Sequence, residues 1–222
     1  MPKSYLSHAS PASNTAITSP AGRGPMIPQK PYRPHGIMVR YHVREAQLEP
    51  PIFFSSLRPE LDGFALSDAL AGRFSSLVNG SDHVFRDRGP SIALRLQWPG
   101  YPSWSRQIPT RDFRSPAGGP VTRAKLAKNI AKSVSRFIAE HASRPMEQDA
   151  DPAWRVGGEG IQLSDLALIR LDHVSKGSWQ VQLCLLEPPK GLAATELGSA
   201  LVSSRTTGTS SSLVLAMQPS SD

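Results

Sequence analysis

The chain has 222 residues, of which 39% are hydrophobic, and a formal net charge of +7. Its single cysteine, Cys184, excludes an internal disulfide and a zinc site built from several cysteines, and the lack of an 18-residue apolar run excludes a transmembrane helix. Because the N-terminus lacks a secretory signal pattern, we expect an intracellular protein, cytoplasmic or nuclear. The first 44 residues contain no acid, as in a mitochondrial transit peptide, but repeated prolines disfavour the amphipathic helix that such a peptide needs.

Proline and small polar residues dominate both ends of the chain. Seven prolines fall within residues 1–34, with few large apolar residues among them, so this stretch cannot bury enough surface to offset the entropy of ordering. The Ser/Thr-rich tail has the same character. We therefore predict a disordered segment over 1–35, one domain over 36–187 with an acidic linker at 143–153, and a disordered tail over 188–222.

The first part of this domain predicts one strand and one helix. Residues 36–43 alternate apolar and polar side chains, as a half-buried strand does. Over residues 64–78, four apolar side chains recur at helical spacing: Leu66, Leu70, Phe74 and Leu77. Gly72 lies inside this predicted helix, where glycine costs up to about 1 kcal/mol relative to alanine.

Two hairpins are predicted farther along the chain. The first joins residues 91–98 to 104–109 through a Pro-Gly-Tyr-Pro turn, because proline lacks the N–H that a strand ladder needs. The second joins residues 166–174 to 178–186 through a turn that contains glycine. Asp172 and His173 are neighbours within a strand, so their side chains should point to opposite faces and should not form a catalytic pair.

The clearest periodicity in the chain runs from Thr122 to about His141. Thr122 is expected to cap a helix there by accepting a backbone N–H. An apolar stripe spans about 120° of this helix and consists of Leu126, Ile130, Val134, Phe137 and Ile138. The predicted fold class is therefore α+β: a single domain in which helix 122–141 and the shorter helix 64–78 pack on an antiparallel sheet made of two hairpins and an N-terminal strand.

Positive charge is concentrated between residues 86 and 144. This stretch has twelve Lys/Arg and three Asp/Glu, a net charge of +9, while the rest of the chain sums to −2. Four of these cations lie within about 80° of one another on the helix, opposite the apolar stripe: Lys125, Lys128, Lys132 and Arg136. Only Glu140 stands four residues from one of them.

This basic helix face has two interpretations. It is either a solvated surface that keeps the protein soluble or a contact surface for an anionic partner, above all nucleic acid. In the second case Tyr101 and Trp104 of the first hairpin would stack on bases beside Arg106, whereas in the first case they pack against the sheet. Binding to a membrane surface is disfavoured, because the domain core needs the apolar side of the helix. The candidate anion or nucleic-acid contacts are Lys125, Lys128, Lys132, Arg136, Arg106, Tyr101 and Trp104.

Motifs of catalysis are missing from the sequence. The glycine-containing stretches lack the spacing of a phosphate-binding loop, the six histidines include no pair at i and i+4, and there is no GxSxG elbow. Cys184 is expected to be a packed small hydrophobe rather than a nucleophile. We therefore predict no catalytic residue, metal or cofactor, and keep an enzyme of unrecognised type as an alternative, because sites converge from distant segments.

Three stretches carry a resemblance: "WPGYPSWSRQI", "GPVTRAKLAKNIAKSVSRFI" and "WRVGGEGIQLSDLALIRLDHVSKGSWQ". They resemble an uncharacterised protein family of mushroom-forming (basidiomycete) fungi that has a similar W-x-G-Y/F-x-x-W turn, GP-[IV]-T-R-x-K-L-A helix entry and VS-x-GSWQ hairpin. The resemblance covers about residues 91–182 and implies a domain extent and a fungal origin, with no activity attached. We predict a non-enzymatic protein-interaction or scaffold domain, with nucleic-acid binding as the alternative.

Overall fold

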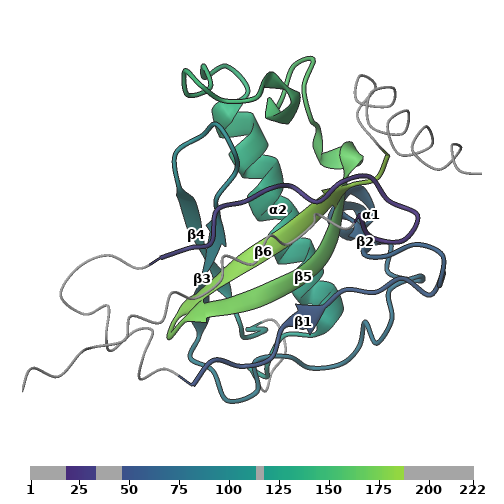
Figure 1. The fold of residues 1–222 in the computed structure, drawn as a ribbon. Coiled ribbons are helices and arrows are strands. Elements are labelled where there is room, and N and C mark those ends of the chain that lie inside the picture. Colours follow the sequence, from purple (N-terminus) through teal and green to yellow (C-terminus); the bar gives the residue numbers. More distant parts are fainter. Residues whose placement is uncertain (1–18, 34–46, 114–117, 188–222) are drawn as a thin grey trace, which may run out of the picture. The chain divides into compact units, whose positions relative to one another are not determined.

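The computed structural model describes residues 19–33, 47–113 and 118–187 of the chain. These residues form a six-stranded sheet with a long helix, α2 (Arg123–His141), across one face, and a shorter helix, α1 (Leu66–Ala71), beside it (Figure 1). The strand order is β1 (Ile52–Phe53), β5 (Leu166–Ser175), β6 (Ser178–Leu185), β3 (Ser91–Leu96) and β4 (Trp104–Pro109), and β2 (Phe64–Ala65) also pairs with β5. Short 3₁₀ turns lie at Pro152–Trp154 and Leu163–Asp165. The predicted α+β class is confirmed, whereas the strand predicted over 36–43 lies outside the described residues.

Both predicted hairpins are present, but the sheet is not wholly antiparallel as we expected. β3 pairs with β4, and β5 with β6, in antiparallel register, while β3 and β6 run parallel over Ala93–Arg95 and Ser178–Gln180. The reason is the position of α2, which connects β4 to β5. A helical crossover returns the chain in the same direction, so β6, which reverses after β5, runs parallel to β3.

Helix α2 follows its prediction closely. The Thr122 hydroxyl caps it by accepting a hydrogen bond from the backbone N–H of Lys125 at 3.2 Å. All five residues of the predicted stripe are buried. They face the apolar side of the sheet, which is formed by Ile92, Leu94, Leu96, Trp98, Trp179, Val181 and Leu183. This contact forms the core of the described domain.

Helix α1 is much shorter than the helix predicted over 64–78. Gly72 adopts a left-handed backbone conformation (φ 80°), and its N–H bonds back to the carbonyls of Asp68 and Ala69. A glycine in this conformation ends a helix. At the other end Phe64 and Ala65 pair with β5 instead of joining the helix. The tendency of Gly72 to end a helix therefore outweighed the helical spacing of the apolar residues on either side of it.

The prediction of disorder over 1–35 is wrong for residues 19–33, of which residues 24–33 lie along β6. We call residues 24–33 the strap. Its backbone bonds to that of β6 at Ile27 N–H to Leu183 C=O, 2.9 Å, and at Leu185 N–H to Pro25 C=O, 3.0 Å. Ile27 is 1% exposed and belongs to the core. One buried isoleucine and a shared strand edge thus order a segment whose composition alone favours disorder.

Gln29 connects the strap to two strands at once. Its side-chain nitrogen donates to the Val181 carbonyl at 2.6 Å, and its oxygen accepts from the Gln97 N–H at 2.8 Å. In turn, the side chain of Gln180 in β6 bonds to the backbone of the strap. It donates to the Lys30 carbonyl at 3.0 Å and accepts from the Tyr32 N–H at 2.8 Å. The two amides satisfy backbone groups where β3 and β6 no longer pair.

Replacing Gln29 by alanine should therefore destabilise the domain by about 1–3 kcal/mol, because two part-buried backbone groups would lose their partners. Urea denaturation followed by tryptophan fluorescence measures this loss. The matched control is Gln107→Ala, because Gln107 is exposed on β4, and it should shift stability by no more than about 0.5 kcal/mol. Equal midpoints for the two variants would show that the Gln29 side chain does not stabilise the strap on the sheet.

The predicted linker, residues 143–153, packs on the turn of the first hairpin. The Glu147 N–H donates to the Gly100 carbonyl at 2.9 Å, and the Trp98 indole donates to the Trp154 carbonyl at 2.7 Å. Gly100 has φ 79°, and the side chains of Met146 and Ala150 occupy the space that a Cβ would need. The segment is thus part of the domain rather than a solvated connection.

Candidate functional site

The basic face of α2 is half neutralised within the domain. Lys125 Nζ lies 2.9 Å from a carboxylate oxygen of Asp112, and Arg136 Nε lies 2.5 Å from one of Glu140. The hydrogen bond from Arg136 is the main reason that the pKa of Glu140 is lowered from its ordinary value. Lys128 and Lys132 form no ion pair with any residue that the structure describes. The predicted four-cation surface is therefore reduced to two unpaired cations.

The aromatic residues predicted to stack on bases are packed against α2 instead. Tyr101 is 5% exposed, its hydroxyl accepts a hydrogen bond from the Val156 N–H at 3.2 Å, and its ring meets Phe137 edge-on. The half-buried Trp104 donates its indole N–H to Glu140 at 2.9 Å. Arg106, on β4, is exposed. Tyr101 thus has no ring face available for a base, and the packing interpretation holds for it.

A different basic surface lies on the side of the sheet opposite α2. It is a groove of about 730 Å³ lined by Lys30, Pro31, Tyr32, Arg33, Arg95, Gln97 and Ser103. A smaller hollow of about 180 Å³ adjoins it and shares Lys30, Gln97 and Ser103. Three of the groove's lining residues are cations and none is a carboxylate. We refer to it as the strap groove.

Arg95 is held in a fixed position in the strap groove. Its Nε donates to the Ser178 hydroxyl at 3.2 Å, and its guanidinium carbon lies 4.4 Å from the centre of the Tyr32 ring. Tyr32 is itself fixed by the bond from its backbone N–H to Gln180. The terminal nitrogens of Arg95 make no hydrogen bond with the described residues. A guanidinium oriented in this way is suited to receive a carboxylate or phosphate group in a bidentate manner.

The strap groove is not among the sites that the sequence predicts, and the reason is identifiable. Lys30, Tyr32 and Arg33 fall in the segment for which the sequence predicts disorder, whereas Arg95 falls on a strand of the first predicted hairpin. The available signal was the local cluster "QKPYRP", in which two cations flank an aromatic residue within an acid-free stretch. The partner that completes the site, Arg95, is more than sixty positions away and is not visible by spacing.

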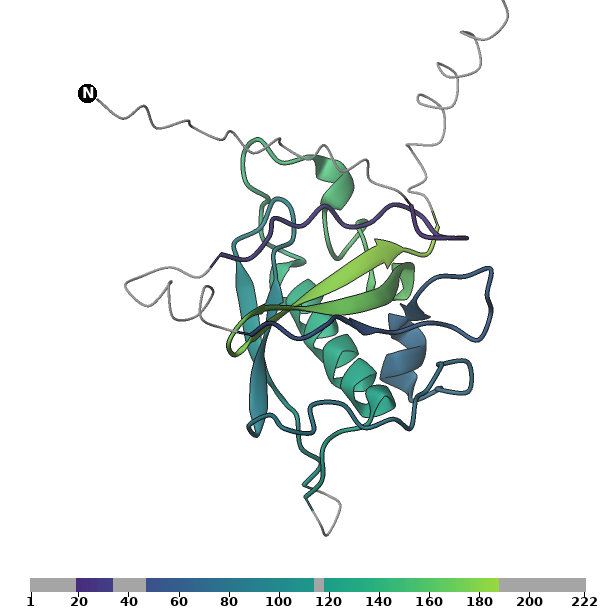
Figure 2. The ribbon, with the colours of Figure 1, turned by 60° about the horizontal axis from the view of Figure 1, so that its bottom comes forward.

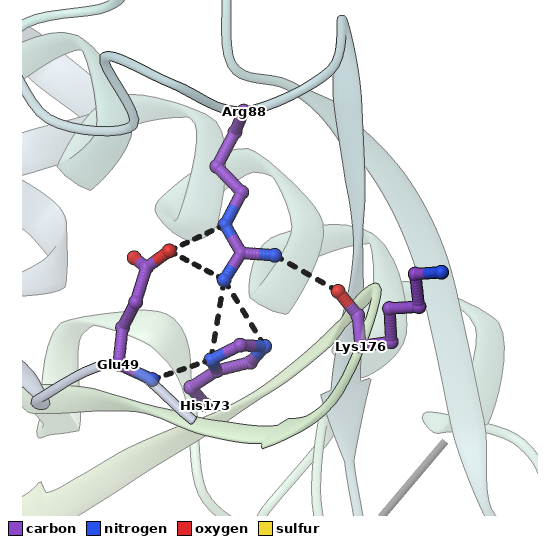
Figure 3. A network of polar contacts seen from close by, with 4 residues as sticks. All are labelled: Glu49, Arg88, His173 and Lys176. Carbon is purple, nitrogen blue, oxygen red and sulfur yellow. Dashed lines mark hydrogen bonds and ion pairs between the residues drawn. The ribbon is translucent and has the colours of Figure 1, made fainter. Parts of the chain in front are cut away.

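A second polar cluster surrounds His173 at the end of the β5–β6 hairpin (Figure 3). His173 is 6% exposed, and its ring lies flat on Trp179 with the ring centroids 4.4 Å apart. Its Nδ1 accepts the backbone N–H of Glu49 at 2.8 Å, and Arg88 Nη2 lies 3.3 Å from the same nitrogen. Arg88 also bonds to the Glu49 carboxylate at 2.7 Å and to the Lys176 carbonyl at 2.9 Å.

The chemistry of this cluster is that of a neutral, buried histidine. Burial, and then the neighbouring Arg88, lower the pKa of His173 from its ordinary value of 6.5. Since Nδ1 accepts a hydrogen bond, the proton of the neutral ring is on Nε2. Asp172 pairs with Arg170 at 2.8 Å and not with His173, which confirms the expectation from strand alternation. The cluster thus connects the segment at Glu49, the loop at Arg88 and the hairpin turn at Lys176 through hydrogen bonds.

Cys184 has the character that the sequence predicts. Its side chain is buried, and burial raises the pKa of its thiol to about 12. A thiol with such a pKa is not a thiolate at neutral pH and is therefore a poor nucleophile. It acts as a small buried side chain of β6, and its backbone pairs with that of Met26 in the strap.

No protein-family model, curated protein or solved structure matches the chain. In the described part of the chain, no three His, Cys, Asp or Glu side chains are grouped as a metal ion would need. Of the helices in the same residues, none combines the length and the apolar character that crossing a membrane requires. The strap groove and the edges of the sheet are therefore the features on which a proposal of function can rest.

Proposed function

We propose that the chain is a protein-interaction domain that binds an acidic segment of a partner protein in the strap groove. The observation that carries this proposal is the arrangement of Arg95, which is fixed by Ser178 and Tyr32 while its terminal nitrogens have no partner among the described residues. Lys30 and Arg33 supply further positive charge at the rim, where both are exposed. Carboxylates of a bound segment would replace the water around these cations with charge-assisted hydrogen bonds.

The strap groove supports this role better than the face of α2 does. Two of the four helix cations already have carboxylate partners, so a ligand there would have to compete with intramolecular ion pairs. The groove also favours a peptide over a nucleic acid. Single-stranded nucleic acids are bound by several aromatic platforms in a row, whereas Tyr32 is the single aromatic residue lining this groove and one of its ring faces is covered by Arg95.

Binding of a fluorescent Glu/Gly-repeat peptide, measured by anisotropy at low and at physiological salt, tests the proposal. We expect Arg95→Gln to weaken the peptide affinity about tenfold, which corresponds to about 1.4 kcal/mol, because the charge-assisted bonds are lost. Lys132→Gln removes an exposed cation from α2 and should leave the affinity within a factor of two. Both variants must keep the melting temperature of the parent protein to be compared.

Two results would refute this function. One is the absence of peptide binding at low salt, and the other is an equal affinity for the parent protein and for Arg95→Gln. A labelled oligothymidine in the same titration tests the alternative. Tight binding of the oligonucleotide that weakens steeply with salt and depends on Lys128 and Lys132 would assign nucleic-acid binding to the α2 face instead.

A further inference from the structure

Strand β4 forms one edge of the sheet. It lies at the end of the strand order, and both ribbon views show it at the border (Figure 1, Figure 2). No strand within the described residues pairs with its outer side. An edge strand presents backbone N–H and C=O groups that can pair with another extended chain.

The hydrogen-bond pattern identifies which groups of β4 face outward. The Thr110 N–H donates to the Pro90 carbonyl at 3.0 Å, so the pairs that exchange hydrogen bonds with β3 are those of Trp104, Arg106 and Ile108. The backbone groups of the two residues between them, Ser105 and Gln107, therefore point away from β3. They provide two donors and two acceptors along the outer edge.

The side chains of β4 add a chemical pattern to this edge. Trp104 is half-buried and Ile108 is buried on the α2 side of the sheet, and the exposed Arg106 stands between them on the same side. Arg106 forms no ion pair with a residue in the part of the chain that the structure describes. Pro102 lies just before the strand and Pro109 ends it, which limits the pairing edge to about five residues.

We propose that β4 is a strand-addition site, which takes an extended, antiparallel segment of a partner protein with an acidic residue opposite Arg106 and apolar residues two positions to either side. In this pairing Ser105 and Gln107 exchange backbone bonds with the segment. The residue across from Arg106 then occupies a non-hydrogen-bonded pair, in which the two side chains come closest. The apolar residues lie across from Trp104 and Ile108. This site is separate from the strap groove and does not depend on it.

The same geometry argues against a second copy of this chain as the occupant. An antiparallel pair of β4 strands that uses Ser105 and Gln107 of both copies places Arg106 directly opposite Arg106. Like charges in direct cross-strand positions are destabilising, and a charge on an edge strand is a common protection against self-pairing. A partner with a carboxylate at the central position converts this repulsion into attraction.

The test uses two labelled nine-residue peptides that differ at one position, Thr-Thr-Val-Thr-Glu-Thr-Val-Thr-Thr and its counterpart with a central lysine. We expect the parent protein to bind the glutamate peptide at least tenfold more tightly than the lysine peptide, and Arg106→Glu to reverse this preference. Gln107→Pro should weaken binding of the glutamate peptide at least tenfold, because it removes an outward N–H. Gln107→Ala keeps that N–H and should bind as the parent protein does. Arg95→Gln, which disrupts the strap groove, should not change either affinity.

Amide hydrogen exchange provides a second readout that does not depend on any variant folding. The Ser105 and Gln107 amides should exchange rapidly in the parent protein and become protected when the glutamate peptide is added. The proposal is overturned if the peptide does not bind, if Arg106→Glu leaves the preference unchanged, or if protection appears away from β4. A dimer of the parent protein that protects the same two amides would also overturn it.

Discussion

Replacing Ile130 by aspartate is expected to abolish cooperative folding of the domain. Ile130 has no exposed surface and sits in the middle of α2, where the helix packs on the sheet. A carboxylate at this position would be buried without a partner, which costs several kcal/mol even after local relaxation. Domains of this size are stable by only about 5–15 kcal/mol, so a single such charge removes most or all of that margin.

Far-UV circular dichroism and thermal melting measure this effect, with two matched variants beside it. Lys132→Asp adds the same carboxylate two residues away on the exposed side of α2 and should keep a cooperative transition. Ile130→Ala removes side-chain volume without adding charge and should cost about 2–5 kcal/mol. A soluble Ile130→Asp variant that melts like the parent protein would mean that the apolar stripe of α2 does not hold the helix on the sheet.

The elements that could be predicted from sequence are those whose pattern is local and long. Helix α2 repeats its apolar residues over five turns, and its cap and its buried face lie where the pattern places them. Strand β4, predicted over 104–109, has those bounds in the structure. In these segments the burial pattern, the turn residues and the helix cap all favour the same structure, which makes a prediction dependable.

The features that could not be predicted depend on contacts between distant residues. The parallel pairing of β3 with β6 follows from the crossover through α2, and the sequence of neither strand indicates it. Composition predicts disorder around Ile27. The residue is nevertheless buried, because the strap pairs with the part of β6 that β3 does not reach. A single apolar residue in a proline-rich stretch carries too weak a signal to oppose the entropy of ordering.

The candidate site shows the same division between local and distant information. The pairing of Arg136 with Glu140 is visible as a spacing of four on a helix. The pairing of Lys125 with Asp112 joins the helix to the loop before it and cannot be read from spacing. Arg95 acquires its contact with Tyr32 only because the strap brings that ring beside it. Net charge therefore indicated a basic region correctly but not which cations remain without a partner.

The stability of the domain should fall as the pH drops below about 6.5, and His173 is the cause. Its pKa is lowered from 6.5 in the folded protein by burial and by Arg88. As the pH falls, the histidine of the unfolded chain therefore binds its proton at a higher pH than that of the folded protein. The stabilisation is fully present above pH 6.5 and is lost as the pH falls through the lower, folded-state pKa. For a single proton the slope of the unfolding free energy is at most about 1.4 kcal/mol per pH unit.

The groups around His173 explain why protonation is unfavourable there. A proton on Nδ1 would face the Glu49 N–H, which now donates to that nitrogen, and would bring a second positive charge beside Arg88. The Glu49 carboxylate offsets part of this repulsion, and the backbone of Lys176 and Ser175 offsets a smaller part. The neutral ring of Trp179 stacks on the His173 ring. Acid should therefore loosen the segment at Glu49 before the sheet itself unfolds.

Urea denaturation at pH 5.5, 6.5 and 7.5 separates this effect from other titrations. His173→Asn keeps an acceptor for the Glu49 N–H but cannot be protonated, so it should be less stable than the parent protein at pH 7.5 yet nearly independent of pH across this range. His83→Asn, at an exposed histidine, should retain the parent slope. Glu140, whose pKa is lowered from 4.5, loses its contribution only below that pH and does not interfere. An unchanged slope in His173→Asn would assign the acid sensitivity to another group and remove His173 as the reason for it.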